Sequence, residues 1–174
     1  WMKQEDNEVV SAQRALDGVW GVDINPFAVA IARFRLIVAA LRACEIKRLR
    51  DAPAWSLHLA TGDSLLLGNR WTSRGDKVAE PQYFDQSWAP EIYACEDKHA
   101  IREILGQQYH AVVGNPPYIT VKDKGLNVAY RRRYPTTCYR QYSLGVPFTE
   151  RFFDLCWTDG GIVVGYVGMI TANS

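Results

Sequence analysis

The sequence predicts an α/β protein with a doubly wound, mostly parallel sheet. Short apolar segments without helical spacing alternate along the chain with longer segments whose apolar residues recur at helical intervals. Such alternation places helices on the faces of a sheet of parallel strands. Hydrophobic residues make up 48% of the 174 residues and charged residues 22%, a composition typical of one globular domain with a buried core.

The N-terminal third predicts a strand, a helix and a second strand. A strand is expected at residues 19–24, where β-forming residues show no helical period. Asn25 and Pro26 follow, and these residue types suit the N-cap and the first position of a helix. That helix is expected over residues 27–43, which are densely apolar with a narrow stripe of arginines. A second strand is expected at 56–60.

The middle of the chain predicts a loop, a helix, a strand and a second loop. Residues 68–90 are polar and mix Gly, Pro and charge, which indicates an insertion loop. A short helix is expected at 96–105, and it leads into a third strand at 109–114. Residues 119–142 are basic and rich in tyrosine, and we expect them to form a loop.

The C-terminal part is expected to add one helix and one strand. Residues 147–158 place Phe148 and Phe152 at helical spacing, and a pair of glycines at 160–161 is typical of a helix end. The apolar run at 162–170 then predicts a final strand.

Charge, cysteine and hydropathy patterns narrow the classes of function. Lys plus Arg number 20 and Asp plus Glu 19, so net charge does not by itself indicate a nucleic-acid partner. The four cysteines form no CxxC pair and the chain has three histidines, so we expect neither a metal site nor a disulfide framework. Free thiols fit a reducing, cytoplasmic location. No apolar run approaches about 18 residues, so we expect no membrane segment.

The tetrapeptide Asn115-Pro116-Pro117-Tyr118 directly follows the predicted third strand. In open α/β sheets, ligands bind beyond the carboxyl ends of the strands. Two prolines remove two backbone N–H donors, so the turn offers carbonyl acceptors, and the Asn115 side chain adds another oxygen. Converging acceptors suit an amino group that must be oriented, and Tyr118 offers a flat face to a planar base. The alternative is that Asn-Pro-Pro is simply a turn.

This tetrapeptide resembles the catalytic motif of amino-methyltransferases. The segments 21–26, 61–65, 110–119 and 142–153 are similar to the adenine-specific (N6) DNA methyltransferases of restriction and BREX-type (PglX-like) phage-resistance systems. The resemblance implies a Rossmann-like methyltransferase that uses S-adenosylmethionine and acts on double-stranded DNA, with other subunits of a defence system as further candidate partners. It assigns catalytic roles to Asn115, Pro116 and Tyr118.

Three residues are candidates for binding the cofactor. In the family, the acid at the position of Asp23 accepts hydrogen bonds from the ribose hydroxyls, and a carboxylate at a strand's carboxyl end favours that role on physical grounds too. Ile24 would lie against the cofactor's adenine, and Asp63 would accept from the adenine amino group. The alternatives are an acid that favours the helix dipole for Asp23, core packing for Ile24, and an N-cap or Asx-turn role for Asp63.

The segment after the turn carries six basic residues and one acid. Basic side chains beside a base pocket can neutralise phosphates, and interleaved tyrosines can stack on displaced bases. The alternative is a solvated, flexible loop. The candidate phosphate contacts are Lys122, Lys124, Arg131, Arg132 and Arg133.

A mechanism follows from these roles. Adenine N6 is paired and stacked inside a duplex, so the base must be flipped out at a cost of roughly a few kcal/mol. Asn115 and the Pro116 carbonyl would then take the two amino hydrogens and hold the nitrogen lone pair toward the methyl donor, so that acceleration comes from positioning and preorganised dipoles. The alternatives are an RNA base or a glutamine amide as substrate, a non-catalytic DNA-binding or interaction fragment, and a nicotinamide-dependent dehydrogenase, which has no use for the proline turn.

Residues 1–174 are expected to be a partial catalytic domain, truncated at both ends. A glycine-rich loop that cradles the methionine part of the cofactor should lie roughly 20 residues before the ribose acid, but residues 1–18 contain Gly18 as their only glycine. That loop and the target-recognition region are therefore expected to be absent, and this segment alone is expected to be inactive.

Overall fold

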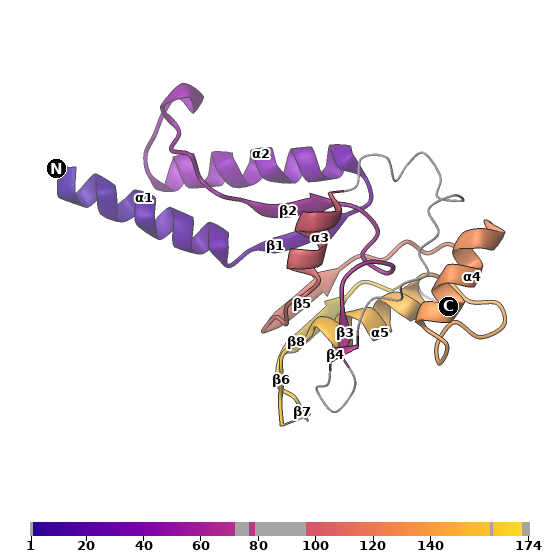
Figure 1. Ribbon diagram of the computed structural model, residues 1–174. Helices are drawn as coiled ribbons and strands as arrows, with labels where there is room; N and C mark the ends of the chain where they lie inside the picture. Colours follow the sequence, from indigo (N-terminus) through magenta and orange to yellow (C-terminus); the bar gives the residue numbers. More distant parts are fainter. Residues whose placement is uncertain (1, 72–76, 79–96, 161, 172–174) are drawn as a thin grey trace.

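The computed structural model describes residues 2–71, 77–78, 97–160 and 162–171. Most of the loop expected at 68–90 lies outside the described residues. Figure 1 shows the arrangement of the elements. In chain order they are α1 (Met2–Asp17), β1 (Trp20–Asp23), α2 (Pro26–Ala43), the 3-10 helix η1 (Leu49–Asp51), β2 (His58–Thr61), β3 (Arg70–Trp71), β4 (Lys77–Val78), α3 (Lys98–Ile104), β5 (Ala111–Gly114), α4 (Lys124–Arg133), α5 (Gly145–Leu155), β6 (Thr158–Asp159), β7 (Ile162–Val163) and β8 (Tyr166–Met169).

The principal strands form two separate parallel pairs. β1 pairs with β2, and β5 pairs with β8. β3 with β4 and β6 with β7 form short antiparallel pairs. The α/β class predicted from the sequence is confirmed. The described strands do not form a single doubly wound sheet. Each of them pairs with one other strand, so that the sheets have two strands each.

The junction between β1 and α2 forms as the local sequence predicts. Asn25 is the N-cap of α2, its side-chain oxygen accepts from the Phe27 amide at 3.0 Å, and Pro26 occupies the first turn. Both α2 and α3 contact β1 and β2. Trp20 and Val22 pack into a core shared with α3. Because side chains alternate along a strand, the opposite face of the pair is turned toward α2.

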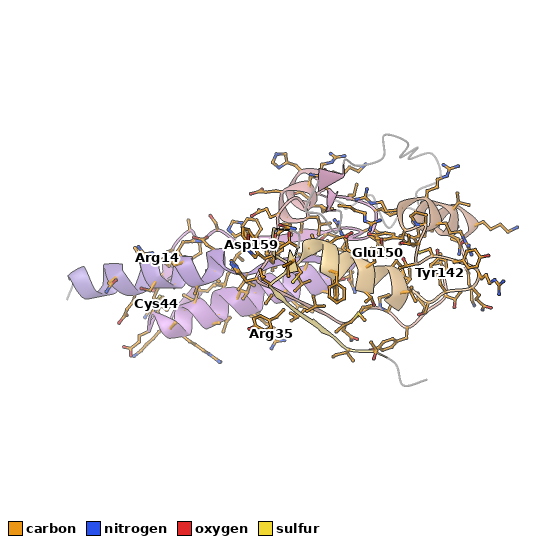
Figure 2. All side chains as sticks on the ribbon, turned by 90° about the horizontal axis from the view of Figure 1, so that it is seen from below. Arg14, Arg35, Cys44, Tyr142, Glu150 and Asp159 are labelled. Atoms are coloured by element: carbon orange, nitrogen blue, oxygen red, sulfur yellow. The ribbon has the colours of Figure 1, made fainter. Side chains whose placement is uncertain are left out.

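Helix α1 is an element that the sequence patterns do not predict. It packs along α2 through the buried residues Ala12, Leu16 and Ala40. Figure 1 shows α1 extending away from the β1–β2 pair and α2 lying over that pair, and Figure 2 shows the two helices side by side, with Arg14 and Cys44 labelled near them. No helix in the described part of the chain is both long enough and apolar enough to cross a membrane.

The apolar run expected as one strand at 162–170 is divided into β7 and β8. Between them, the amides of Val164 and Gly165 both donate to the Trp157 carbonyl, at 3.0 and 3.3 Å, and this bends the chain. A Cβ at position 165 would lie 2.6 Å from the Cys156 Sγ. The close approach of the backbone to Cys156 therefore requires glycine at the bend.

Two buried clusters join the strand pairs to the helices. The central core contains Ala60, Leu67, Ile101, Leu105 and Leu155, and it packs against residues of both β1 and β5. The second cluster, which we call the tyrosine core, consists of Leu65, Leu66, Tyr130, Tyr134, Cys138, Tyr142 and Leu144.

The tyrosine core corrects the prediction of a loop at 119–142. This segment contains helix α4, which Asp123 caps by accepting from the Leu126 amide at 2.7 Å. Three tyrosines that the sequence places among candidate stacking residues, Tyr130, Tyr134 and Tyr142, are buried. The segment is a packed part of the fold because its aromatic residues cover Leu65 and Leu66.

Candidate active site

The carboxyl ends of β1 and β2 bring two of the predicted cofactor residues together. Asp23 is the last residue of β1 and lies opposite Thr61, the last residue of β2. Asp63 follows two residues later, and the Gly62 amide donates to the Asp23 carbonyl at 2.9 Å. The two acids therefore lie on adjacent strand ends, at the edge where open α/β sheets bind ligands.

Asp23 and Ile24 have exposed side chains. Asp23 Oδ1 accepts from the Asn25 amide at 2.7 Å, which holds the carboxylate at the start of α2, where the helix dipole favours negative charge. Ile24 is 38% exposed. An exposed carboxylate beside an exposed apolar side chain fits a nucleoside, because the first can accept from ribose hydroxyls and the second can cover a base.

Asp63, in contrast, is buried, and both of its carboxylate oxygens accept hydrogen bonds. Oδ1 accepts from the amides of Leu65 and Leu66 at 2.8 and 3.3 Å, which is the Asx-turn arrangement considered as the alternative for this residue. Oδ2 accepts from the Tyr130 hydroxyl at 2.6 Å. Sequence reasoning does not single out Tyr130, because nothing local distinguishes it from the exposed Tyr139 of the same segment.

The Asn-Pro-Pro-Tyr turn leaves the carboxyl end of β5. Asn115 is exposed, Pro116 is buried, and Tyr118 is 48% exposed. The Tyr118 hydroxyl donates to Asn115 Oδ1 at 3.0 Å. Because an amide oxygen has two lone pairs, Asn115 can accept from a ligand while Tyr118 orients it. The turn thus combines an oriented acceptor with an accessible aromatic ring.

The backbone is fixed on both sides of this turn. A Cβ at position 114 would lie 2.5 Å from Cζ of Phe152, a buried residue of α5, so the strand end approaches α5 too closely for any residue but glycine. After the turn, the Leu144 amide donates to the Ile119 carbonyl at 2.9 Å. Both contacts are made by α5, the first by Phe152 and the second by its N-cap residue Leu144.

Three buried side chains hold the segment that follows Asp63, and we call them the carbonyl clamp: Arg133, Tyr134 and Arg151. Arg133 and Tyr134 end α4, and Arg151 lies on α5. Burial lowers the pKa of Arg151. Burial also raises the pKa of Tyr134 to about 12, against the opposing effect of the nearby arginines. The clamp donates to the main-chain carbonyls of Ser64, Leu65, Leu67, Gly68 and Asn69.

Arg70 continues this connection to α5. Its Nε lies 2.6 Å from Oδ2 of Asp154, and its guanidinium also pairs with Glu150. Glu150 is labelled on α5 in Figure 2. The whole stretch from Asp63 to Arg70 is therefore attached to α4 and α5 by hydrogen bonds and ion pairs.

The predicted phosphate contacts divide into exposed and internal residues. Lys122, Lys124 and Arg132 have exposed side chains. Arg133 is 6% exposed and donates to the carbonyls of Leu65 and Gly68. The prediction for Arg133 is corrected accordingly, because a guanidinium committed to buried carbonyls does not reach a phosphate.

Arg131 is also engaged within the protein. It donates to Oδ1 of Asn127 at 2.6 Å and to the carbonyls of Cys138 and Arg140. Its guanidinium also lies over the ring of Tyr142, 5.4 Å from the centroid. These contacts tie α4 to the turn that follows it, so we leave Arg131 out of the proposed DNA contacts.

Other side-chain groups give no further candidate centre. Within the ranges that the structure describes, no cluster of three or more His, Cys, Asp or Glu side chains is arranged to hold a metal ion. The cysteines described there, Cys44, Cys138 and Cys156, are free thiols.

Comparison with known proteins identifies the family. Residues 17–174 match the Eco57I restriction-modification methylases. The chain is 50% identical over 169 residues to the adenine-specific methyltransferase PglX of Streptomyces coelicolor, and the match covers 92% of this chain and 14% of that relative. No solved structure matches the chain. Because the family match spans nearly the whole chain, this protein belongs to the Eco57I restriction-modification methylase family.

Proposed function

We propose that the full-length protein transfers a methyl group from S-adenosylmethionine to N6 of an adenine flipped out of double-stranded DNA, in a restriction-modification or phage-defence system. The observation that carries this proposal is the proline turn at the end of β5, where the side chains of Asn115 and Tyr118 are both exposed. The family supports the reaction class, and the turn supplies the groups that such a reaction needs.

The turn acts on the amino group of the base. Tyr118 takes one lone pair of Asn115 Oδ1, which leaves the second directed to a hydrogen of the adenine amino group. The Pro116 carbonyl accepts the other hydrogen. With both hydrogens held, the nitrogen lone pair points at the methyl donor, and the two oxygens stabilise the positive charge that develops on nitrogen. The N–C bond would form as the C–S bond of the donor breaks, S-adenosylhomocysteine would leave, and the methylated nitrogen would release one proton to solvent.

The exposed ring of Tyr118 holds the flipped base. Unstacking costs roughly a few kcal/mol, and stacking on an aromatic side chain returns about 1–3 kcal/mol. Because the Tyr118 hydroxyl is bonded to Asn115, the ring that stacks on the base and the amide that orients its amino group are fixed relative to one another.

The residues at the ends of β1 and β2 fit the nucleoside part of the cofactor. When bound, S-adenosylmethionine supplies an activated methyl group. Asp23 accepts from the ribose hydroxyls, Ile24 covers the adenine, and Asp63 accepts from the adenine amino group. Lys122, Lys124 and Arg132, which are exposed after the catalytic turn, neutralise DNA phosphates.

Substitution of Asn115 in the full-length protein tests the proposal. Asn115→Ala should reduce methyl transfer on the order of a hundredfold or more, while the Kd for S-adenosylhomocysteine stays near the wild-type value. The matched control is Asn7→Ala, which changes an exposed asparagine on α1. Mass spectrometry of digested DNA measures N6-methyladenine. Activity of Asn115→Ala within a few-fold of wild type would show that the acceptor assignment is wrong.

Two substitutions of Tyr118 separate its ring from its hydroxyl. Tyr118→Phe keeps the ring and should lower the rate only a few-fold. Tyr118→Ala removes stacking worth about 1–3 kcal/mol and should lower the rate between about fivefold and a hundredfold. Equal losses would assign the role to the hydrogen bond with Asn115 instead. If methyl groups are found on RNA or on glutamine amides and none on DNA, the substrate is RNA or protein and not DNA.

A further inference from the structure

Helix α4 carries a buried tyrosine that reaches the acid at the end of β2. Tyr130 is 5% exposed and Asp63 is 4% exposed, and the hydroxyl donates to Oδ2 at 2.6 Å. The two residues are 67 positions apart in the sequence, so the fold alone brings them together. A hydroxyl-to-carboxylate bond of this length lies in the charge-assisted range.

Donors from the described part of the chain hold both oxygens of the Asp63 carboxylate. Leu65 and Leu66 donate to Oδ1 from the main chain of the Asx turn, and they belong to the same local segment as Asp63. Tyr130 donates to Oδ2 from another element, helix α4. Its hydroxyl therefore holds Oδ2 directly, whereas the Asx turn holds Oδ1.

We propose that Tyr130 is a positioning residue for cofactor binding. It orients the Asp63 carboxylate, so that a lone pair of that carboxylate meets the amino group of the cofactor's adenine. This inference rests on the proposed function, in which Asp63 is the acceptor for that group. It adds a residue of α4 to the cofactor site.

The position of Tyr130 on α4 gives the contact a second consequence. Lys124 and Arg132 lie exposed on the same helix, and both are proposed DNA contacts. The Tyr130 hydroxyl therefore connects the helix that carries these two residues to the Asp63 carboxylate.

Tyr130→Phe in the full-length protein tests the inference, because it removes the hydroxyl and keeps the ring in the tyrosine core. Isothermal titration with S-adenosylhomocysteine measures cofactor affinity. We expect the Kd to rise about tenfold, the loss of one charge-assisted hydrogen bond, whereas kcat at saturating cofactor and the KM for DNA stay within about twofold. Urea unfolding confirms that each variant is folded.

Tyr142→Phe is the matched control. Tyr142 is also buried in the tyrosine core, but its hydroxyl donates to the Asn127 carbonyl at 3.5 Å and not to the carboxylate. The Kd should change less than about twofold. An equal rise in Kd for both variants would mean that Tyr130 only supports packing, and the inference would be rejected.

Asp63→Asn separates failure of this inference from failure of the proposed function. Asparagine keeps the Asx-turn oxygen but replaces the carboxylate. If Asp63→Asn leaves the Kd unchanged, the cofactor role of Asp63 itself is wrong. If Asp63→Asn weakens binding and Tyr130→Phe does not, only the positioning role is wrong. If both weaken it and the double variant is no weaker than Asp63→Asn alone, Tyr130 acts through Asp63.

Discussion

Gly114→Ala is the sharpest test of how the catalytic turn is positioned. The added methyl carbon would lie 2.5 Å from Cζ and 3.1 Å from Cε2 of Phe152, whereas carbon atoms in contact are about 3.5–4.0 Å apart. Phe152 cannot simply move aside, because it is buried and packs edge-on against Phe148 with the ring centroids 6.0 Å apart. The strand end must shift instead. Overpacking of this kind costs about 1–3 kcal/mol of unfolding free energy.

The shift should also affect methyl transfer, because Asn115 follows directly. A displacement of about 1 Å at a reacting group can cost on the order of a hundredfold in rate. Urea unfolding measures the loss of stability, and transfer of methyl groups to DNA by the full-length protein measures the loss of rate. Gly145→Ala is the control, since its added carbon would meet Ser143 Oγ at an ordinary 3.7 Å. That variant should be neutral or more stable by up to about 1 kcal/mol.

A second substitution shows whether the collision with Phe152 is the cause. In a Phe152→Leu background the ring is gone, so Gly114→Ala should cost at least about 1 kcal/mol less than it does in the wild type. If Gly114→Ala destabilises both backgrounds equally, the strand end is not limited by Phe152. If Gly114→Ala destabilises neither background, β5 does not lie that close to α5.

Two further predictions concern alkaline stability and DNA binding. The folded pKa of Tyr134 is about 12, above the ordinary value of 10, so the folded state retains a proton that the unfolded state loses. Its contribution to stability should therefore be nearly complete below pH 10 and fall by roughly 2 kcal/mol as the pH rises from 10 to 12. Urea unfolding across that range should show a smaller decline for Tyr134→Phe. For DNA, replacing Lys124 and Arg132 together by alanine should lower the slope of log Kd against log salt by nearly 2, and an unchanged slope would remove both from the interface.

Local sequence was sufficient to predict β1, α2 and the exit from β5. Asn25 and Pro26 determine the start of α2 through their own side chains, so no distant residue is needed. The proximity of Asp23 and Asp63 also follows from the sequence, because neighbouring parallel strands end at the same edge. The start of α2 depends on neighbouring residues, and the proximity of the two acids depends on the parallel pairing of β1 and β2.

The parts that sequence patterns missed depend on contacts between distant segments. Arg133 lies in a run of arginines that is typical of an exposed surface, but it is buried because the carbonyls of Leu65 and Gly68, more than sixty residues away, need donors. Tyr130 is buried for a related reason, since its partner is Asp63. Composition shows which side chains a segment contains. The partners of those side chains depend on the fold, because they belong to distant segments.

Helix α5 relates the two halves of the site to each other. Its adjacent residues Arg151 and Phe152 act on different segments: Arg151 holds the carbonyls that follow Asp63, and Phe152 sets the closest approach of β5 just before Asn115. The proposed methyl transfer requires Asp63 and the turn that begins at Asn115 at a fixed separation. Because neighbouring residues of one rigid helix support both, that separation does not depend on a continuous sheet between β1 and β5. A change in α5 that moves either residue should therefore affect cofactor binding and the rate of transfer together.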